Sequence, residues 1–407
     1  MVIKTIIIII FCLLFLYDIL LKVISLKSVA NKIPDNVRDV YDSATYQEWQ
    51  SYYREKLRLS LISGSVSFLI ELILLGWNIY AAFAGLFPDT LWLQMVAVLL
   101  LSVFTGVLQL PFSYYDTMGI EEKYGFNRTT RKTFWMDQIK GFLIGLVILL
   151  AVGSVLLWLH QLLGIWLIVV FAIVMTLIAL FIAFLYPVLR RVFNKFTPLE
   201  DEELKMKLTA LLEKHDYKVR AIQVMDASRR STKANAFFSG FGKMKTIVLF
   251  DTLLETMTSE EICAVFAHEL GHGLHKDTLK NQVLAFVQML ILGVLAWLTL
   301  SLADIYPPFG FGTVNYGFAM ILIMSVEFAL LSPLFGLVIN MVSRKAEYRA
   351  DQQAVQEGYG EDLISALKKL ARRDFSHIAP DPLLVKLEYS HPTLSQRIEA
   401  IRKNTSR

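Results

Sequence analysis

The stretch AVFAHELGHGLHKD, residues 264–277, contains two histidines and a glutamate at the spacing that a zinc hydrolase uses. On a helix, His268 and His272 lie about 6 Å apart along the axis, so both imidazoles can reach one ion. Neutral imidazole nitrogens are good ligands for Zn²⁺. Glu269 projects beside them, where it can take a proton from the attacking water. The spacing therefore predicts a hydrolytic zinc site, which needs a third protein ligand and an open position.

A capped amphipathic helix is expected to position these residues. Thr258 and Glu261 stand at the spacing of a capping box just before the motif. Gly271 and Gly273 would allow neighbouring elements to approach closely. The apolar side of this helix is formed by Ile262, Val265 and Phe266.

The third ligand is expected from VSRKAEYRADQQAV, where Glu347 and Asp351 are four residues apart and so share a helical face. Glu347 can bind the metal while Asp351 accepts a hydrogen bond from a ligand histidine. From spacing alone, an ordinary solvated charged face beside three basic residues explains this pair equally well. His275 lies about 10.5 Å along the axis from His268, too far to share its ion on a straight helix, and is interpreted as a solvated residue.

The composition places this chemistry in a membrane protein. Of the 407 residues, 55% are hydrophobic and 19% charged, against about 25% charged residues in soluble domains. The mean hydropathy is +0.51, and a net charge of +4 is too small to indicate nucleic-acid binding. Seven stretches are long and apolar enough to span a bilayer, at about 2–26, 60–87, 91–112, 140–160, 164–190, 280–303 and 316–342.

The basic residues predict the orientation. No Lys or Arg occurs between Arg58 and Lys123, between Lys140 and Arg190, or between Lys280 and Arg344. The positive-inside rule then places the zinc-motif segment and the C-terminus in the cytoplasm and the N-terminus outside. The basic segments assigned to the cytoplasm are 27–58, 113–140, 190–280 and 343–407.

Four regions follow from this topology. Residues 1–190 hold the first five transmembrane helices, and residues 281–342 hold the last two. Between them, residues 191–280 form a cytoplasmic α+β insert with a helical pattern at 198–217 and strand-like runs at 219–226 and 245–251. Residues 343–407 are a helical region that completes the site.

Three carboxylates, Asp18, Glu71 and Glu327, fall inside the predicted spans. Charged groups at that depth usually face a protein interior or a water-filled cavity. They could join helices through hydrogen bonds or line a wet chamber, and the sequence leaves both interpretations open.

Four ordered motifs resemble the integral-membrane CAAX prenyl endopeptidases, zinc metalloproteases that process prenylated proteins. They are His-Glu-Leu-Gly-His at 268–272, SRKAEYRAD at 343–351, KANAFFSGFG at 233–242 and YSHPTLSQRI at 389–398. The number of spans and the position of the motif between the fifth and sixth agree with the family layout. The resemblance therefore extends over nearly the whole chain.

The resemblance implies a fold and a set of residue roles. Seven transmembrane helices would enclose a large water-filled chamber, which would bring water to a hydrolytic site in the membrane plane. One zinc ion per chain would be bound by His268, His272 and Glu347. Glu269 would be the catalytic base, and Asp351 would support a ligand histidine. The substrate backbone would be held at Asn235, Ala236 and Phe237, and the cleaved bond would be flanked by His391 and Arg397.

Physical arguments support some of these roles independently. Pro392 suits the first turn of a helix, which would place His391 at the N-cap, from where it could donate to an oxyanion. Arg397 could hold a carboxylate or a carbonyl. An unpaired strand near Asn235 could bind an extended peptide by strand addition. Without the resemblance, an ordinary cap residue and a plain hairpin are the simpler interpretations of these two stretches.

The expected function is hydrolysis of peptide bonds near the C-terminus of CAAX-type, prenylated substrates. Short outer loops and the ending RKNTSR, which lacks an ER-retention signal, favour a prokaryotic relative in the cell (inner) membrane over a eukaryotic ER enzyme. In a cell without prenylated proteins, the alternative is a membrane-protein quality-control protease. The oligomeric state is left open.

A transporter or metal-binding scaffold with a structural His-Glu-x-x-His is the alternative from another class. A structural zinc site would fill all four positions with protein ligands, and the sequence has no suitable cysteine. Transporters also more often show internal repeats and broken helices, which this sequence does not show. Both comparisons favour the peptidase.

Overall fold

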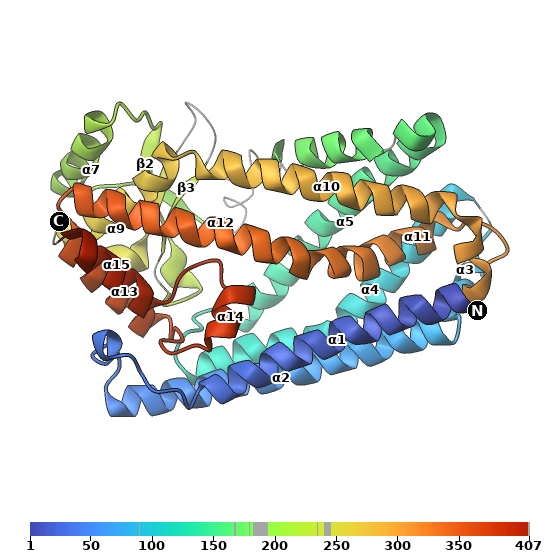
Figure 1. Ribbon diagram of the computed structural model, residues 1–407, viewed down its shortest axis with the longest axis horizontal. Helices are drawn as coiled ribbons and strands as arrows, with labels where there is room; N and C mark the ends of the chain where they lie inside the picture. The colour runs from blue at the N-terminus through green and yellow to red at the C-terminus, as the bar shows by residue number, and fades with distance from the viewer. Residues whose placement is uncertain are drawn as a thin grey trace.

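The protein, seen in a computed structural model, is an elongated bundle of helices with a small β-sheet at one end (Figure 1). The structure describes residues 1–88, 90–166, 168–178, 180–181, 194–233, 235–239 and 246–405. The N-terminus lies at the end opposite the sheet, and the C-terminus lies at the sheet end. The long helices connect these two ends.

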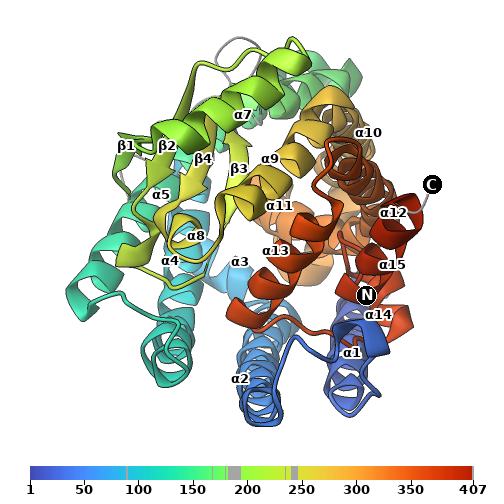
Figure 2. The same ribbon diagram turned by 90° about the vertical axis from the view of Figure 1, so that its left-hand side faces the viewer.

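The helices of the bundle lie around its periphery when viewed along the long axis from the sheet end (Figure 2). They are α1 (Val2–Ser28), α2 (Ser43–Gly76), α4 (Leu91–Tyr115), α5 (Arg131–Leu163), α10 (Asp277–Ser301) and α12 (Phe328–Gln356). Shorter helices at the N-terminal end are α3 (Ile79–Ala84) and α11 (Tyr316–Leu322). A π-helical turn, η2 (Asp116–Glu121), follows α4, and another, η8 (Ile323–Glu327), joins α11 to α12.

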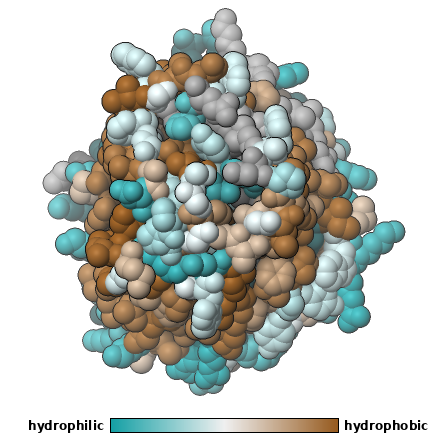
Figure 3. Space-filling model, turned by 90° about the vertical axis from the view of Figure 1, so that its right-hand side faces the viewer, coloured by the Kyte–Doolittle hydropathy of each residue, from teal (hydrophilic) through white to brown (hydrophobic). Residues whose placement is uncertain are grey.

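Four helices of the described residues are long and apolar enough to cross a membrane. They are Val2–Ser28, Ser43–Gly76, Asp277–Ser301 and the continuous stretch Tyr316–Gln356. On α1 the residues at least half exposed recur every three or four positions, at Ile6, Ile9, Leu13, Leu16 and Leu20. Such a stripe is a lipid-facing helix surface. Hydrophobic residues also cover most of the N-terminal end of the molecule, around a hydrophilic patch near its centre (Figure 3).

The helix bounds correct one of the predicted spans. The stretch 60–87 is not a single helix: α2 begins at Ser43, ends at Gly76 and is followed by the separate α3. The Asp42 side chain caps α2 by accepting from Thr45 N, and Asn78 breaks the chain direction with a left-handed φ of 58°. The expected loop 27–58 therefore contains the first turns of a long helix.

The other expected spans fall on helices where the chain is described. Those at 2–26, 280–303 and 316–342 correspond to α1, α10 and α11–α12, and those at 91–112 and 140–160 lie within α4 and α5. The stretch 164–190 begins with a 3₁₀ turn, Gly164–Trp166, and its residues 167, 179 and 182–190 lie outside the described residues. The count of seven spans stays a prediction.

A four-stranded sheet of order β1-β2-β4-β3 forms the core of the region that follows. The strands are β1 (Phe196–Pro198), β2 (Ala221–Met225), β3 (Ala236–Ser239) and β4 (Thr246–Phe250). β2 and β4 are parallel, and the two outer strands are antiparallel to their neighbours. The predicted strands at 219–226 and 245–251 are thus confirmed.

Helices pack on this sheet through the periodic leucines of the sequence. In α7 (Glu202–Lys214) the buried residues are Leu204, Leu208, Leu211 and Leu212, which confirms the predicted helix. α8 (Asp251–Leu254) and α9 (Ser259–Leu274) follow β4 directly. At the start of α9, the Thr258 side chain accepts from Glu261 N while Glu261 accepts from Thr258 N, so the predicted capping box is present.

The C-terminal region packs against α9 and α12. It consists of α13 (Gly360–Arg373), α14 (Pro382–Leu387) and α15 (Leu394–Thr405). α13 is strongly amphipathic and buries Leu363 and Ile364, and α15 buries Ile398 and Ile401 in the same cluster. This packing brings residues far apart in the sequence to the side of α9.

Close contact between α9 and α12 depends on Gly271. A Cβ atom at this position would lie 2.9 Å from Ala350 Cα and 3.0 Å from Gln353 Cβ, and both of these atoms belong to α12. Likewise, a Cβ at Gly273 would collide with the Tyr217 ring and hydroxyl. The expectation that these glycines allow close approach is confirmed.

We expect Gly271→Ala to destabilise the protein by about 1–3 kcal/mol, because α12 must move away to relieve the overlap. Thermal unfolding in detergent measures this effect. Gly145→Ala on α5 is the matched control, since a Cβ there has nothing within 4 Å and alanine favours a helix. A Gly271→Ala protein that unfolds at or above the wild-type temperature would contradict tight packing of α9 on α12.

Candidate metal centre

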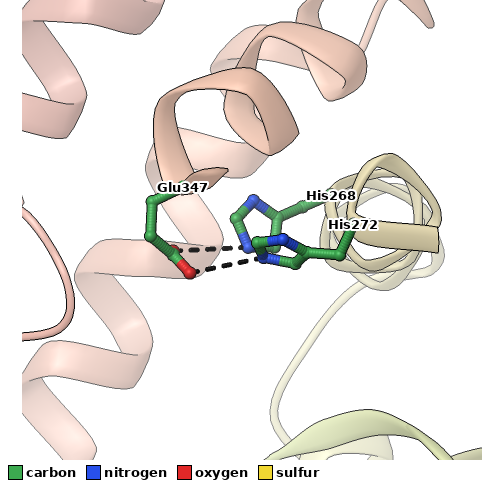
Figure 4. A group of neighbouring side chains, drawn as sticks. All are labelled: His268, His272 and Glu347. Carbon is green, nitrogen blue, oxygen red and sulfur yellow. Dashed lines mark ion pairs between the residues drawn. The ribbon is translucent and has the colours of Figure 1, made fainter. Parts of the chain in front are cut away.

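His268 and His272 on α9 meet Glu347 on α12 at the place where the two helices touch (Figure 4). One ligand atom from each residue lies within 4.8 Å of the others. The Glu347 carboxylate points at both imidazoles, with Oε2 3.6 Å from His268 Nε2 and Oε1 3.3 Å from His272 Nε2. The structure therefore assembles the three predicted metal ligands from two helices that are far apart in sequence.

The set fits a catalytic zinc ion. Two imidazole nitrogens and one carboxylate form a three-ligand set that leaves a fourth position for water. Glu347 is 4% exposed, and among the residues that the structure describes no donor forms a hydrogen bond to its Oε2. A buried carboxylate oxygen that accepts no hydrogen bond is well suited to binding a cation.

Asp351 lies directly behind His268, as expected. Its Oδ1 is 2.9 Å from His268 Nδ1, so an ionised carboxylate accepts the Nδ1 proton and leaves Nε2 directed at Glu347. Asp351 is 1% exposed. This buried charge needs a cation beside it.

Arg397 on α15 supplies that cation. Its Nε and Nη2 donate to Asp351 Oδ2 and Oδ1 at 2.9 Å and 2.5 Å. Its Nη1 lies 3.3 Å from Glu347 Oε2. Arg397 is itself 9% exposed, and its guanidinium mainly contacts the carboxylates of Asp351 and Glu347.

Sequence reasoning missed Asp277, at the first turn of α10. Its Oδ2 is 3.2 Å from His272 Nδ1, and its Oδ1 accepts from Arg349 Nη2 at 2.7 Å and from Lys280 Nζ at 3.1 Å. The signal was present as an acid five residues after His272. On a straight helix, Asp277 would point away from the His272 imidazole. Instead α9 ends at Leu274, and Lys276 turns the chain with a φ of 55°.

The local electrostatics shift the pKa values of several site residues, Glu269 and His272 among them. Burial raises the pKa of Glu269 above its usual range, although the neighbouring histidines oppose this. Burial opposes charge on His272, but the carboxylates of Glu347, Glu269 and Asp277 outweigh it and raise its pKa to about 9. Protons therefore compete with a metal ion for this imidazole.

A cavity of about 740 Å³ opens beside the three ligands. Glu269, His391 and Asn235 line it together with the ligands, so the predicted base faces the same space. Its lining also includes the apolar side chains of Leu363, Leu367, Leu370, Ile378 and Leu394. A peptide with apolar side chains would fit these surroundings.

The predicted substrate-binding strand lies at this cavity. Within the described residues β3 is the last strand of the sheet order, so one edge has no strand beside it there. Asn235 and Ala236 line the cavity. Phe237 instead packs on the opposite face of the sheet with Val248 and Phe250, and could contact a peptide only through its backbone. Residues 234 and 240–242 of this motif lie outside the described residues.

The placement of His391 corrects its predicted cap role. α15 begins at Leu394, and Thr393 is its N-cap: the Thr393 hydroxyl accepts from Gln396 N while the Gln396 side chain accepts from Thr393 N. This reciprocal pair is the better cap, and Pro392 lies before the helix. His391 Nε2 is 3.3 Å from Glu347 Oε1, so the residue is beside the metal ligands although it is not a cap.

The carboxylates predicted to lie in spans mostly join helices. Asp18 pairs with Lys22 on the same helix at 2.7 Å. Glu327 accepts from the Thr299 hydroxyl of α10. Glu71 accepts from the Tyr80 hydroxyl at 2.8 Å and also lines a second cavity of about 530 Å³, between α1, α2, α4 and η8. Glu71 thus fits both interpretations, while His275 is exposed as expected.

Comparisons with known proteins agree with this arrangement. Residues 22–195 match the family described as "CAAX prenyl protease N-terminal, five membrane helices", and residues 198–405 match "Peptidase family M48". The crystal structure of S. mikatae Ste24p superposes with a TM-score of 0.91 and 28% identity, over 98% of this chain and 99% of that one.

Curated relatives match over similar lengths. The chain is 32% identical over 386 residues to an Arabidopsis thaliana protein named CAAX prenyl protease 1 homolog, covering 91% of this chain and 90% of the relative. It is 31% identical over 418 residues to CAAX prenyl protease 1 of Saccharomyces cerevisiae, covering 91% and 88%.

The fold and the site together define a membrane metallopeptidase. Within that class, the chain belongs to peptidase family M48 and to its CAAX prenyl protease group.

Proposed function

We propose that the protein is a zinc endopeptidase that cleaves near the C-terminus of prenylated CAAX-type proteins. The observation that carries this proposal is the group of His268, His272 and Glu347 in a cavity that Glu269 also lines. The names of the relatives supply the substrate class. Each chain would bind one zinc ion through these three side chains.

The residues around the cavity have separate roles in peptide hydrolysis. A bound zinc ion would polarise the scissile carbonyl and lower the pKa of a water molecule toward ~7. Glu269 accepts the proton of the attacking water and passes it to the leaving amine. Burial raises the pKa of Glu269, the direction that strengthens it as a proton acceptor. His391 donates to the developing oxyanion.

Arg397 supports the site in this scheme mainly through the ligands. Its contacts with Asp351 and Glu347 fix the two carboxylates from behind. Arg397 also lines the cavity, so we retain the role that its motif suggested, a contact with the substrate carbonyl.

Substrate binding is proposed at the edge of β3. An extended peptide added beside Asn235 and Ala236 would form main-chain hydrogen bonds with the strand. Its side chains would point alternately to the cavity side and to the opposite face of the sheet. The apolar wall of the cavity suits the aliphatic residues of a CAAX sequence.

The proposed topology has seven spans, with the N-terminus outside and the metal centre and C-terminus in the cytoplasm. The regions 1–190, 191–280, 281–342 and 343–407 are its four parts. The distribution of Lys and Arg supports it, and the matched N-terminal family is described by membrane helices.

The test uses detergent-purified wild-type protein with a farnesylated and an unprenylated copy of one CAAX peptide. We expect cleavage of the farnesylated copy and about one zinc ion per chain. Equal cleavage of both copies would replace the proposal by general membrane proteolysis. Absence of both cleavage and bound metal would contradict the proposed enzyme.

A further inference from the structure

The two ligand histidines have matching surroundings on their far sides. His268 Nδ1 is 2.9 Å from Asp351, which pairs with Arg397. His272 Nδ1 is 3.2 Å from Asp277, which pairs with Arg349 at 2.7 Å. Each imidazole thus has a carboxylate behind it, and each carboxylate has an arginine behind it.

The two arginines are distributed so that each carboxylate has its own cation. Arg349 and Asp351 are two residues apart on α12, and so point to different sides of that helix. One side serves His268 through Asp351, and the other serves His272 through Arg349 and Asp277. Lys280, one turn into α10, adds a second cation to Asp277 at 3.1 Å.

His272 has the greater need of such support. Its side chain is 25% exposed, against 9% for His268, so surrounding packing restrains its ring less. It also stands two residues before the last residue of α9, Leu274, where helices fray. Asp277 is 5% exposed and is fixed by cations from α10 and α12.

We propose that Asp277 is a positioning residue for His272. Its carboxylate accepts from His272 Nδ1 so that Nε2 faces Glu347 and the ion, and the hydrogen bonds from Arg349 and Lys280 hold that carboxylate in place. This inference rests on the proposed metal site and extends it. It also ties the beginning of the membrane helix α10 to the centre.

The first measurement is the dissociation constant of Zn²⁺, determined by competition with a chelator, for the full-length wild type and Asp277→Asn. We expect about 10- to 100-fold weaker binding in the variant, the usual effect of losing a carboxylate behind a ligand histidine. The visible absorption of the Co²⁺-substituted protein should change as well, because the ring orientation alters the ligand field.

Glu357→Gln is the matched control. Glu357 has a side chain only 3% exposed and pairs with Lys214 and His215 at the end of α12, away from the ligands. It therefore repeats the burial and pairing of Asp277 without its contact to a ligand. Its removal should leave both the Zn²⁺ dissociation constant and the Co²⁺ spectrum unchanged. Thermal unfolding of the metal-free proteins records any loss of fold in either variant.

Three outcomes decide the inference. Weaker Zn²⁺ binding and an altered spectrum in Asp277→Asn alone would support it. Wild-type affinity and spectrum in Asp277→Asn, or equal losses in both variants that follow unfolding temperature, would leave Asp277 a general salt-bridge residue and overturn the inference. A wild-type protein that binds no metal would overturn the proposed function as well.

Discussion

Glu269→Gln is expected to lower the rate of peptide hydrolysis by a factor of about 10²–10⁴, the contribution of a general base, and to leave metal binding intact. Glutamine has the size of glutamate but cannot accept the proton of the attacking water. Glu269 lines the cavity with the ligands yet is not one of the three side chains that converge on the ion site. The measurement is the initial cleavage rate of a farnesylated peptide, together with zinc content of the same samples.

Glu260→Gln is the control for this change. Glu260 lies in the first turn of the same helix, nine residues before Glu269, and pairs with Lys207 outside the cavity. The Glu260→Gln protein should cleave the farnesylated peptide at the wild-type rate. Near-wild-type activity in Glu269→Gln would contradict its assignment as the base. Loss of zinc from that variant would show that Glu269 helps to hold the ion.

The sequence predicted those features that depend on neighbouring residues. The capping box of Thr258 and Glu261, the ligand spacing of His268 and His272, and the pairing of Glu347 with Asp351 all follow from the 3.6-residue period of a helix. The structure then places Asp351 within hydrogen-bond distance of His268. Burial excludes the solvated charged face that spacing alone left open, since Glu347 and Asp351 are at most 4% exposed.

The features that sequence could not predict depend on turns and tertiary contacts. The end of α2 at Gly76 follows from the left-handed conformation of Asn78, which hydropathy does not detect because the apolar run continues past it. Asp277 reaches His272 only because Lys276 reverses the chain. The predicted N-cap, His391, lies two residues before the observed one, because Thr393 and Gln396 exchange hydrogen bonds at the start of α15.

Arg397 shows the same limit for a residue role. Its motif suggested contact with the cleaved bond, but a single sequence does not show which carboxylates a buried guanidinium meets. In the structure Asp351 takes a two-point contact and Glu347 lies at 3.3 Å. These contacts indicate that the main effect of Arg397 is on the ligands.

Arg397→Ala is accordingly expected to destabilise the metal-free protein by about 3–5 kcal/mol, because it leaves buried carboxylates without their cation. Arg397→Lys should restore only part of this, since an ammonium group cannot make the two-point contact with Asp351 and also reach Glu347. Both variants should bind zinc more weakly than wild type. Chemical unfolding in detergent and chelator competition measure the two effects.

Arg372→Lys is the control for exchanging an arginine for a lysine at an ion pair outside the site. Arg372 lies on α13 and pairs with Asp42, and both side chains are 54% exposed, so the substitution should change stability little. If Arg397→Lys kept wild-type stability and zinc affinity but hydrolysed peptide slowly, the guanidinium would act on the substrate, as the sequence motif suggested. If affinity and stability fall together with the rate, Arg397 acts through Glu347 and Asp351, and the oxyanion is left mainly to His391, whose Nε2 is 3.3 Å from Glu347 Oε1.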